Sequence, residues 1–331
     1  MKYSVGYQMR EDYEFLNLII EQKEKIHEVY FSWGDFANGR NNQTRQMGLT
    51  PWEAMRRQET DLLMLAKEGL SFNLLFNATC YGKDSQSRAF YNRVGETVAY
   101  IQEHFGLKSI TTTSPLIARF VHDNFEDIDV RSSVNMSIGT IEGMEYVADW
   151  FDSFYVKREC NRDLGKIKEL KSWCDANGKT LYALANSGCL NHCSAHVFHD
   201  NLVSHESEIA AMDNGYVFEG VCGKFLKDPD HFHGLLDYTS YIRPEDVDVY
   251  EGLVPALKLA TRVSLYPERI LKVYLTNHSY RGSMLDLLEP NHTNVLYPWL
   301  LENAKIKTKI ENEKLVYYNL EEALIKLPDL S

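Results

Sequence analysis

Short runs of β-branched and aromatic residues alternate along the chain with longer stretches in which apolar residues recur every three or four positions. This alternation is typical of βαβ units that build a parallel sheet. The short runs predict eight strands, at residues 3–8, 28–33, 71–78, 109–113, 130–136, 153–158, 180–185 and 256–260. The longer stretches predict helices at 11–24, 51–68, 87–105, 115–124, 139–149 and 161–177.

About eight such units in 331 residues predict an α/β fold, a TIM-like (β/α)8 barrel with a long irregular insertion after strand 7. Residues 188–241 form this insertion, because they are rich in His, Asp, Asn and Gly and show no clear period. A long connection of this kind is usually functional, and it follows a strand at the barrel end where active sites form. We expect a barrel domain at 1–290 that includes the insertion, and a C-terminal extension at 291–331 packed on the barrel.

The chain contains six cysteines and begins without a signal-peptide pattern, which favours free thiols or metal ligands over disulfides. Cys189 and Cys193 are spaced C-x-x-x-C, Cys222 follows in the same insertion, and Cys80 comes just after the third predicted strand. Thiolates are soft ligands that suit iron-sulfur clusters and zinc. The four cysteines therefore predict a [4Fe-4S] cluster, with zinc and unligated loop cysteines as alternatives. Cys160 is the substitute for Cys80 if Cys80 is distant.

Cys174 is set apart from these thiols by the helical pattern at 161–177. It continues the apolar series of Leu164, Ile167 and Leu170, so it is expected to be a small buried hydrophobic residue.

Histidines crowd the start of the insertion, at positions 192, 196, 199 and 205. The spacing of His192 and His196 would also suit zinc. A surface or hydrogen-bonding role is the other interpretation of each of them. His199, between Phe198 and Asp200, is the one placed for a structured polar role.

Polar residues also occupy the predicted strand ends: Asn77, Arg131, Asn135, Arg158, Glu159, Asn186, Lys258 and Arg262. Buried charges cost free energy unless they are paired or used on a ligand, so this clustering indicates an anionic or strongly hydrogen-bonding substrate. Any single one could instead belong to a structural ion pair. The candidate catalytic residues are Arg158, Asn186, His199 and Arg262, because Arg binds carboxylates with two hydrogen bonds.

The charge balance limits the classes of molecule that the protein is expected to bind. Asp and Glu number 47 against 35 Lys and Arg, giving a net charge of −12 that opposes nonspecific binding to nucleic acids and anionic lipids. A net charge does not exclude a local basic pocket. No apolar run approaches the length that crosses a bilayer. We therefore expect a cytoplasmic protein with a small-molecule or peptide substrate, no membrane contact and no strong nucleic-acid binding, while a protein partner stays open.

An ordered series of motifs resembles the U32 family, which is labelled as peptidases or collagenase-like proteases. The motifs span roughly residues 3–290 and are Arg131-Ser132-Ser133-Val134-Asn135-Met136, Arg158-Glu159-Cys160-Asn161-Arg162-Asp163, Asn186-Ser187-Gly188-Cys189-Leu190 through Cys193, Phe198-His199-Asp200-Asn201, Tyr241-Ile242-Arg243-Pro244-Glu245-Asp246 and Lys258-Leu259-Ala260-Thr261-Arg262. The resemblance implies a TIM-like barrel. In several relatives it also implies a four-cysteine [4Fe-4S] cluster that serves oxygen-independent hydroxylation of RNA bases or of a quinone precursor.

Three functional interpretations follow. The first is an iron-sulfur-dependent enzyme of the U32 type that modifies a small-molecule or peptide substrate, with oxygen-independent hydroxylation as the implied reaction. The second is a metal-dependent peptidase or hydrolase with a metal-bound water near His199. The third is a noncatalytic partner protein with a structural metal site.

Overall fold

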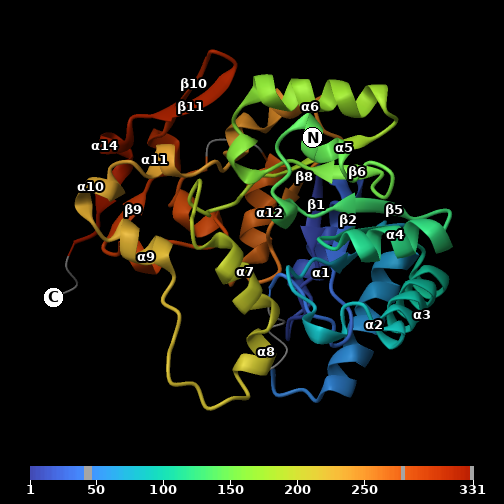
Figure 1. Ribbon diagram of the computed structural model, residues 1–331. Helices are drawn as coiled ribbons and strands as arrows, with labels where there is room; N and C mark the ends of the chain where they lie inside the picture. Colours follow the sequence, from blue (N-terminus) through green and yellow to red (C-terminus); the bar gives the residue numbers. More distant parts are fainter. Residues whose placement is uncertain (41–46, 277–279, 329–331) are drawn as a thin grey trace.

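The computed structural model describes residues 1–40, 47–276 and 280–328. Eight parallel strands form a closed barrel in sequence order, and β1 pairs with β8 to complete it (Figure 1). The strands are β1 (Lys2–Gly6), β2 (Ile26–Phe31), β3 (Phe72–Phe76), β4 (Leu107–Thr112), β5 (Asp129–Ser132), β6 (Ser153–Tyr155), β7 (Thr180–Leu184) and β8 (Ala256–Leu259). The predicted TIM-like barrel is confirmed.

Two predicted strands are shorter than expected. Residues after β5 and β6 leave the barrel wall and form 3-10 turns at Val134–Met136 and Arg158–Cys160. The Ser133 side chain accepts a hydrogen bond from the Asn135 N–H at 3.2 Å, which favours the first of these turns over a continued strand.

Helices cover the outside of the barrel. The six predicted helices are present as α1 (Glu14–Glu21), α2 (Pro51–Lys67), α3 (Arg88–Phe105), α4 (Pro115–Asn124), α5 (Ile141–Glu145) and α6 (Leu164–Ala176), and α12 (Pro267–Thr276) follows β8. Local signals set their ends. Thr50 and Glu53 form a capping box at the start of α2, and Gly106, with φ of 75°, ends α3 in the left-handed conformation.

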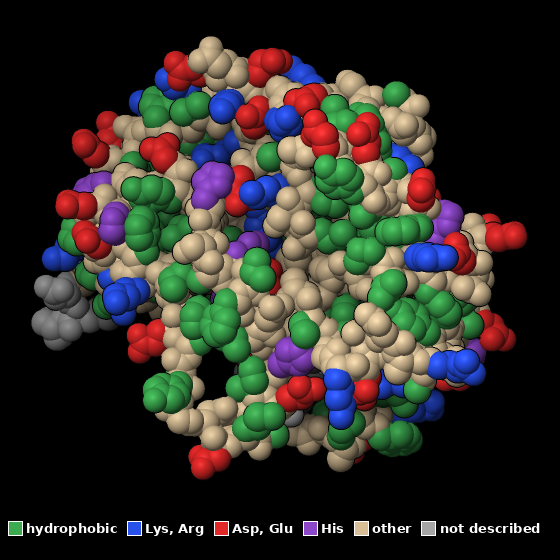
Figure 2. Space-filling view, viewed as in Figure 1, with side chains coloured by type: hydrophobic (Ala, Val, Ile, Leu, Met, Phe, Trp, Pro, Cys, Tyr) green, Lys and Arg blue, Asp and Glu red, His purple; other side chains and the backbone are tan. Residues whose placement is uncertain are grey.

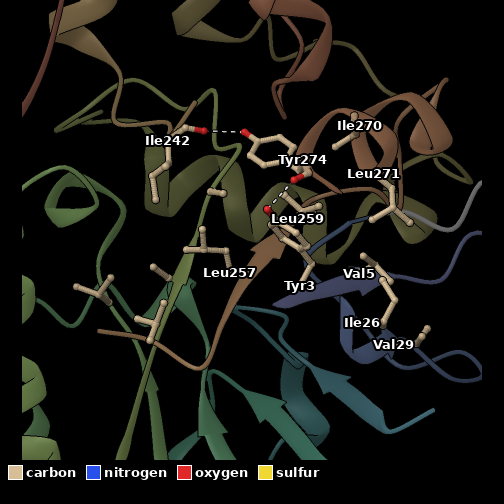
Figure 3. Packing of buried hydrophobic residues seen from close by; sticks show 14 of the residues in the cluster. Tyr3, Val5, Ile26, Val29, Ile242, Leu257, Leu259, Ile270, Leu271 and Tyr274 are labelled. Carbon is tan, nitrogen blue, oxygen red and sulfur yellow. Dashed lines mark hydrogen bonds between the residues drawn. The ribbon is translucent and has the colours of Figure 1, made fainter. Parts of the chain in front are cut away.

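The main core lies between the strands and these helices. Alternate residues of each strand point outward, as Tyr3 and Val5 do on β1, and pack against helices such as α12 (Figure 3). The Tyr3 hydroxyl donates to the carbonyl of Tyr274 on α12 at 2.7 Å, and the Tyr274 hydroxyl donates to the carbonyl of Ile242 at 2.7 Å. The buried phenol groups are thereby satisfied, and they fix α12 against the barrel.

The inside of the barrel contains a buried cluster of polar side chains around Glu28 and Arg131. The Arg131 guanidinium on β5 lies 2.6 Å from Glu28 Oε1 and 2.7 Å from Asp129 Oδ2. Hydroxyl groups of Ser4 and Ser109 donate to the same Glu28 carboxylate. Arg131 and Glu28 are both almost fully buried, so Arg131 belongs to a structural ion pair rather than to the substrate pocket.

The insertion after β7 contains more helix than its sequence indicates. It forms α7 (His196–Ser204), α8 (Glu206–Ile209), α9 (Val221–Leu226), α10 (Pro229–Phe232) and α11 (Leu235–Tyr238). Only α7 exceeds six residues. Helices of one turn leave too few repeats for an apolar period to be recognised, which is why the segment looks irregular in sequence.

The C-terminal part adds two small antiparallel sheets beside the barrel. It contains α13 (Thr293–Leu296), β9 (Trp299–Leu301), β10 (Lys307–Glu311), β11 (Lys314–Tyr318), α14 (Leu320–Ala323) and β12 (Leu324–Lys326), with β10 paired to β11 and β9 to β12. Figure 1 shows the β10–β11 hairpin near α6, where the Leu164 N–H donates to the Glu313 carbonyl at 2.8 Å. The last residues of the predicted extension, 329–331, lie outside the described residues. Among the described residues, every helix is too short or too polar to span a bilayer.

Candidate active site at the carboxyl ends of the strands

A small cavity of about 60 Å³ opens at the carboxyl ends of the barrel strands. Its walls come from strand ends and from the loops that follow them, which is where a barrel of this kind places active sites. The lining residues are Tyr30, Gly39, Arg40, Asn77, Val134, Asn135, Arg158, Leu184, Ser187, Lys258, Ala260, Arg262, Val263 and Glu289. The face drawn in Figure 2 has a hollow in which Lys, Arg and His side chains gather.

Positive charge dominates this cavity. Arg40, Arg158, Lys258 and Arg262 line it, and Glu289 is the one carboxylate among its lining residues. Glu289 already forms an ion pair with Arg40, because its Oε1 lies 3.1 Å from Nε of Arg40. Among residues 1–40, 47–276 and 280–328, the other three cations have no carboxylate within ion-pair distance.

Polar neighbours hold the Arg158 side chain in place. Its Nη2 donates to Asn135 Oδ1 at 2.6 Å, and its Nη1 lies 3.0 Å from Nε2 of His196, which is itself 3.1 Å from Oδ2 of Asp200. The Nε atom of Arg158 is buried and has no hydrogen-bond partner in the described part of the chain. The guanidinium is therefore oriented by Asn135 and His196, and it makes no direct ion pair with a carboxylate in the described part of the chain.

Burial changes the protonation of the two cations from the β8 region. Burial, opposed by the phenol of Tyr30 and assisted by the charge of Arg40, lowers the pKa of Arg262 to about 10. Burial and the charge of Arg262 lower the pKa of Lys258 to about 7. An anion in the cavity would favour the charged forms of both groups.

The Ser187 hydroxyl adds a neutral polar group to the cavity wall. The side chain is 3% exposed, and its oxygen has no hydrogen-bond partner within the described residues. A buried hydroxyl without a partner costs free energy, which a bound ligand would recover.

The four predicted catalytic residues have different placements. Arg158 and Arg262 lie together in the cavity wall, whereas Asn186 and the predicted ligand cysteines are not among its lining residues. Asn186 is fully buried next to it, where its amide bonds the backbone of Ala260 and Leu287, so it holds the strand ends in position.

His199 lies on the exposed side of α7, with its ring 5.4 Å from that of Phe218. Its contact with the cavity is electrostatic: partial burial and then the charge of Arg40 lower the pKa of the imidazole.

Three of the predicted ligand cysteines are electrostatic neighbours. Burial raises the pKa of the Cys222 thiol, and negative charge on Cys189 and on Cys193 raises it further. Charge on Cys189 also acts on the Arg40 guanidinium, whose pKa is raised because Glu289 and Cys189 together outweigh its burial. The thiols of Cys189, Cys193 and Cys222, called the thiol trio below, therefore influence one another electrostatically, and Cys189 also influences Arg40 in the cavity wall.

The thiol trio does not form a finished coordination shell. Within the described residues, no three Cys, His, Asp or Glu side chains are arranged to hold a metal ion. The donor chemistry itself suits a soft metal centre, because all three residues are partly buried free thiols.

Cys80 has a different set of neighbours. Its thiol hydrogen-bonds with His205, which lowers the pKa of the thiol and raises that of the imidazole. Nδ1 of His205 lies 2.9 Å from Oε2 of Glu208. Cys80 therefore interacts with His205 and Glu208, as a Cys-His-Glu series, rather than with the thiol trio.

The two remaining cysteines, Cys174 and Cys160, are buried or partly buried. Cys174 is fully buried on α6, as predicted. Cys160 lies on the turn after β6, where burial raises the pKa of its thiol.

Sequence reasoning missed Arg40 and Glu289. Arg40 follows β2, and its position in a loop at the carboxyl end of a strand was the signal that could have identified it. Glu289 lies 30 residues beyond the end of β8 and reaches the site because the chain returns beside the segment that follows β7, where Ser187 forms an isolated parallel bridge with Glu289. No local pattern reveals that return.

Comparisons with known proteins agree with this architecture. No family model matches the sequence. The chain is 22% identical to an uncharacterized protease, MJ1657, of Methanocaldococcus jannaschii over 320 residues, covering 91% of this chain and 90% of the relative. The solved U32 peptidase Mk0906 has a similar fold, with a TM-score of 0.54 and 15% identity, covering 78% of this chain and 91% of that one. The chain is thus similar along most of its length to an uncharacterized protease, and it shares the fold of a solved U32 peptidase.

Proposed function

We propose that this protein is a U32-type enzyme that binds the anionic group of a small molecule or peptide in the cationic cavity. One observation carries the proposal: Arg158, Lys258 and Arg262 surround a single cavity without a carboxylate partner in the described part of the chain. Leaving such charges buried and unpaired is costly, and a bound anion would offset that cost. The similarity to proteins labelled as proteases supports an enzyme.

The geometry suggests how such an anion would be held. The planar guanidinium groups of Arg158 and Arg262 suit the two oxygens of a carboxylate. The unpartnered hydroxyl of Ser187 offers a further hydrogen bond. A cavity of about 60 Å³ admits a few water-sized groups, so only the charged end of a large substrate would enter it.

The thiol trio would supply the cofactor site. Cys189, Cys193 and Cys222 would hold a [4Fe-4S] cluster, or zinc as the alternative, and a cluster would supply the redox chemistry of an oxygen-independent hydroxylation. The effect of Cys189 on Arg40 supports a cofactor that sits next to the bound anion. Cys80 would complete a four-cysteine set only by giving up its hydrogen bond with His205, so the fourth ligand stays a prediction.

Calorimetric titration with pyruvate, oxalate and phosphate tests the anion site. We expect binding to the native protein that weakens at high salt, and at least tenfold weaker binding to an Arg262→Met variant, about 1.4 kcal/mol. Arg119→Met is the matched control, because Arg119 lies exposed on α4 with its guanidinium near Asp123. Equal affinity of the native and Arg262→Met proteins, or no binding of any of the three anions, would contradict the proposal.

The Cys80 series favours a second candidate function, a thiol-dependent hydrolase. A thiol beside an imidazole that is oriented by a carboxylate is the arrangement of activated cysteine nucleophiles. Since His205 lowers the pKa of the Cys80 thiol, alkylation of Cys80 by iodoacetamide should begin at a lower pH than that of an ordinary thiol near 8.5. His205→Ala should move that pH profile upward. A Cys80 profile unaffected by His205→Ala would exclude this candidate.

A further inference from the structure

Lys258 is the most unusual titratable group in the cavity. It points inward from β8, while its neighbours Leu257 and Leu259 point outward into the main core. The side chain is 8% exposed, yet its ammonium group makes no hydrogen bond or ion pair with the described residues. Lysine is rarely buried without a partner, because burial of its charge is costly.

Aromatic rings hold this side chain. Nζ of Lys258 lies 4.1 Å from the ring centre of Tyr30 and 5.0 Å from that of Tyr155. The Tyr30 hydroxyl is occupied, since it donates to the carbonyl of Leu259 at 2.7 Å. The amine is therefore positioned by ring faces and keeps its lone pair for a ligand.

From this geometry we propose that Nζ of Lys258 is a nucleophile that forms an imine with the carbonyl group of a short oxo acid bound in the cavity. The proposal rests on the anion site proposed above, and it adds the reacting group and the substrate class. It does not depend on the thiol trio or on a metal.

The charge environment supports a neutral amine. Burial lowers the pKa of Lys258 to about 7, the charges of Arg262, Arg131 and Arg158 lower it as well, and the carboxylate of Glu28 opposes them. A large fraction of the amine is then unprotonated at neutral pH, as nucleophilic lysines require.

The cations define the substrate class. A carboxylate held by Arg158 and Arg262 would bring an adjacent carbonyl carbon toward the inward-pointing amine, because all three residues line the same small cavity. Oxo acids with few carbon atoms match both the charge and the volume of this site.

The reaction balances without an oxidant or reductant. The Nζ lone pair forms a bond to the carbonyl carbon, and the carbonyl π electrons move to oxygen. An amine proton passes to that oxygen to give a carbinolamine, which loses its hydroxyl group with one further proton as water. The product is the imine, and one water leaves for each carbonyl consumed.

Reductive trapping with pyruvate tests the proposal. The native protein is incubated with pyruvate and sodium cyanoborohydride, and the modified lysine is located by peptide mass spectrometry. We expect one dominant adduct, on Lys258, that is lost in Lys258→Met and strongly reduced in Arg262→Met. Lys227→Met is the control and should be labelled like the native protein.

The outcomes separate this inference from the proposed function. Binding of pyruvate by calorimetry with no adduct at Lys258 would overturn the imine and leave the anion site standing. Adducts spread over many lysines, with Lys258 not preferred, would overturn it as well. No pyruvate binding and no adduct would reject pyruvate-like oxo acids as the substrate class, whereas oxalate and phosphate binding would still report separately on the anion site. Circular dichroism of Lys258→Met confirms that loss of labelling does not come from unfolding.

Discussion

Replacing Lys258 by methionine should stabilise the protein, and the gain should depend on pH. Methionine has a similar length and lets the space between the Tyr30 and Tyr155 rings remain filled. The folded protein lowers the pKa of Lys258 from 10.5 to about 7, which means that it disfavours the ammonium form. At about 1.4 kcal/mol for each pKa unit, that preference is about 5 kcal/mol.

The sign of the pH dependence follows from proton binding. Between about pH 7 and pH 10 the unfolded chain binds a proton at Lys258 that the folded protein does not, so the stability of the native protein rises with pH in this window. Below about pH 7 Lys258 is protonated in both states, and the folded state bears the full cost of burying the ammonium group. The advantage of Lys258→Met should therefore be largest below pH 7 and fall by about 2 kcal/mol between pH 7 and pH 9.

Urea denaturation of both proteins at several pH values measures this difference. Lys272→Met serves as the control, because Lys272 is an exposed residue of α12. A difference between Lys258→Met and the native protein that stays constant from pH 6 to pH 9 would refute the argument. So would destabilisation by the variant at pH 6, since it would mean that the ammonium has a favourable partner.

Two further substitutions have defined outcomes. Glu28→Gln should lower the free energy of unfolding by about 3 kcal/mol near pH 7, because it removes one partner of the buried Arg131 ion pair. Burial opposes the effect of Arg131, yet the pKa of Glu28 is lowered overall, so this difference should vanish as the pH falls below about 4 in acid denaturation. Gly6→Ala should weaken pyruvate binding in calorimetry, because the added Cβ would lie 2.5 Å from Cγ of Arg262 and displace it. An unchanged pyruvate affinity of Gly6→Ala would show that Arg262 does not touch the anion.

Much of the barrel could be predicted from the sequence, because each strand and most outer helices carry their own local pattern. The helix at Leu164–Ala176 shows this, since Leu164, Ile167, Leu170 and Cys174 are buried as their spacing indicates. The ends of β5 and β6 could not be predicted, because the strand-like pattern of residues continues past the point where the chain leaves the barrel wall. Side-chain hydrogen bonds at Ser133 decide that turn, and they leave no periodic signal.

The site was predictable only in part. Arg158 and Arg262 follow recognisable strands, so the rule that strand ends meet at one end of the barrel brings them together. Cys80 follows a strand as well, but its partner His205 comes from α7 and α8, whose packing on the barrel no local pattern determines. Asn186 lies at a strand end and carries an amide that could bind a substrate. Only the structure reveals that this amide already forms hydrogen bonds with the backbone.

The proposal that the thiol trio and the cationic cavity form one reaction centre is tested most directly by the absorption spectrum of the anaerobically purified protein. The spectrum is recorded with iron and acid-labile sulfide analysis before and after addition of pyruvate. We predict bound iron and sulfide with a band near ~400 nm. We also predict that pyruvate changes this band in the native protein and not in Arg262→Met. A protein without iron and sulfide, or a spectrum that saturating pyruvate leaves unchanged, would contradict the claim.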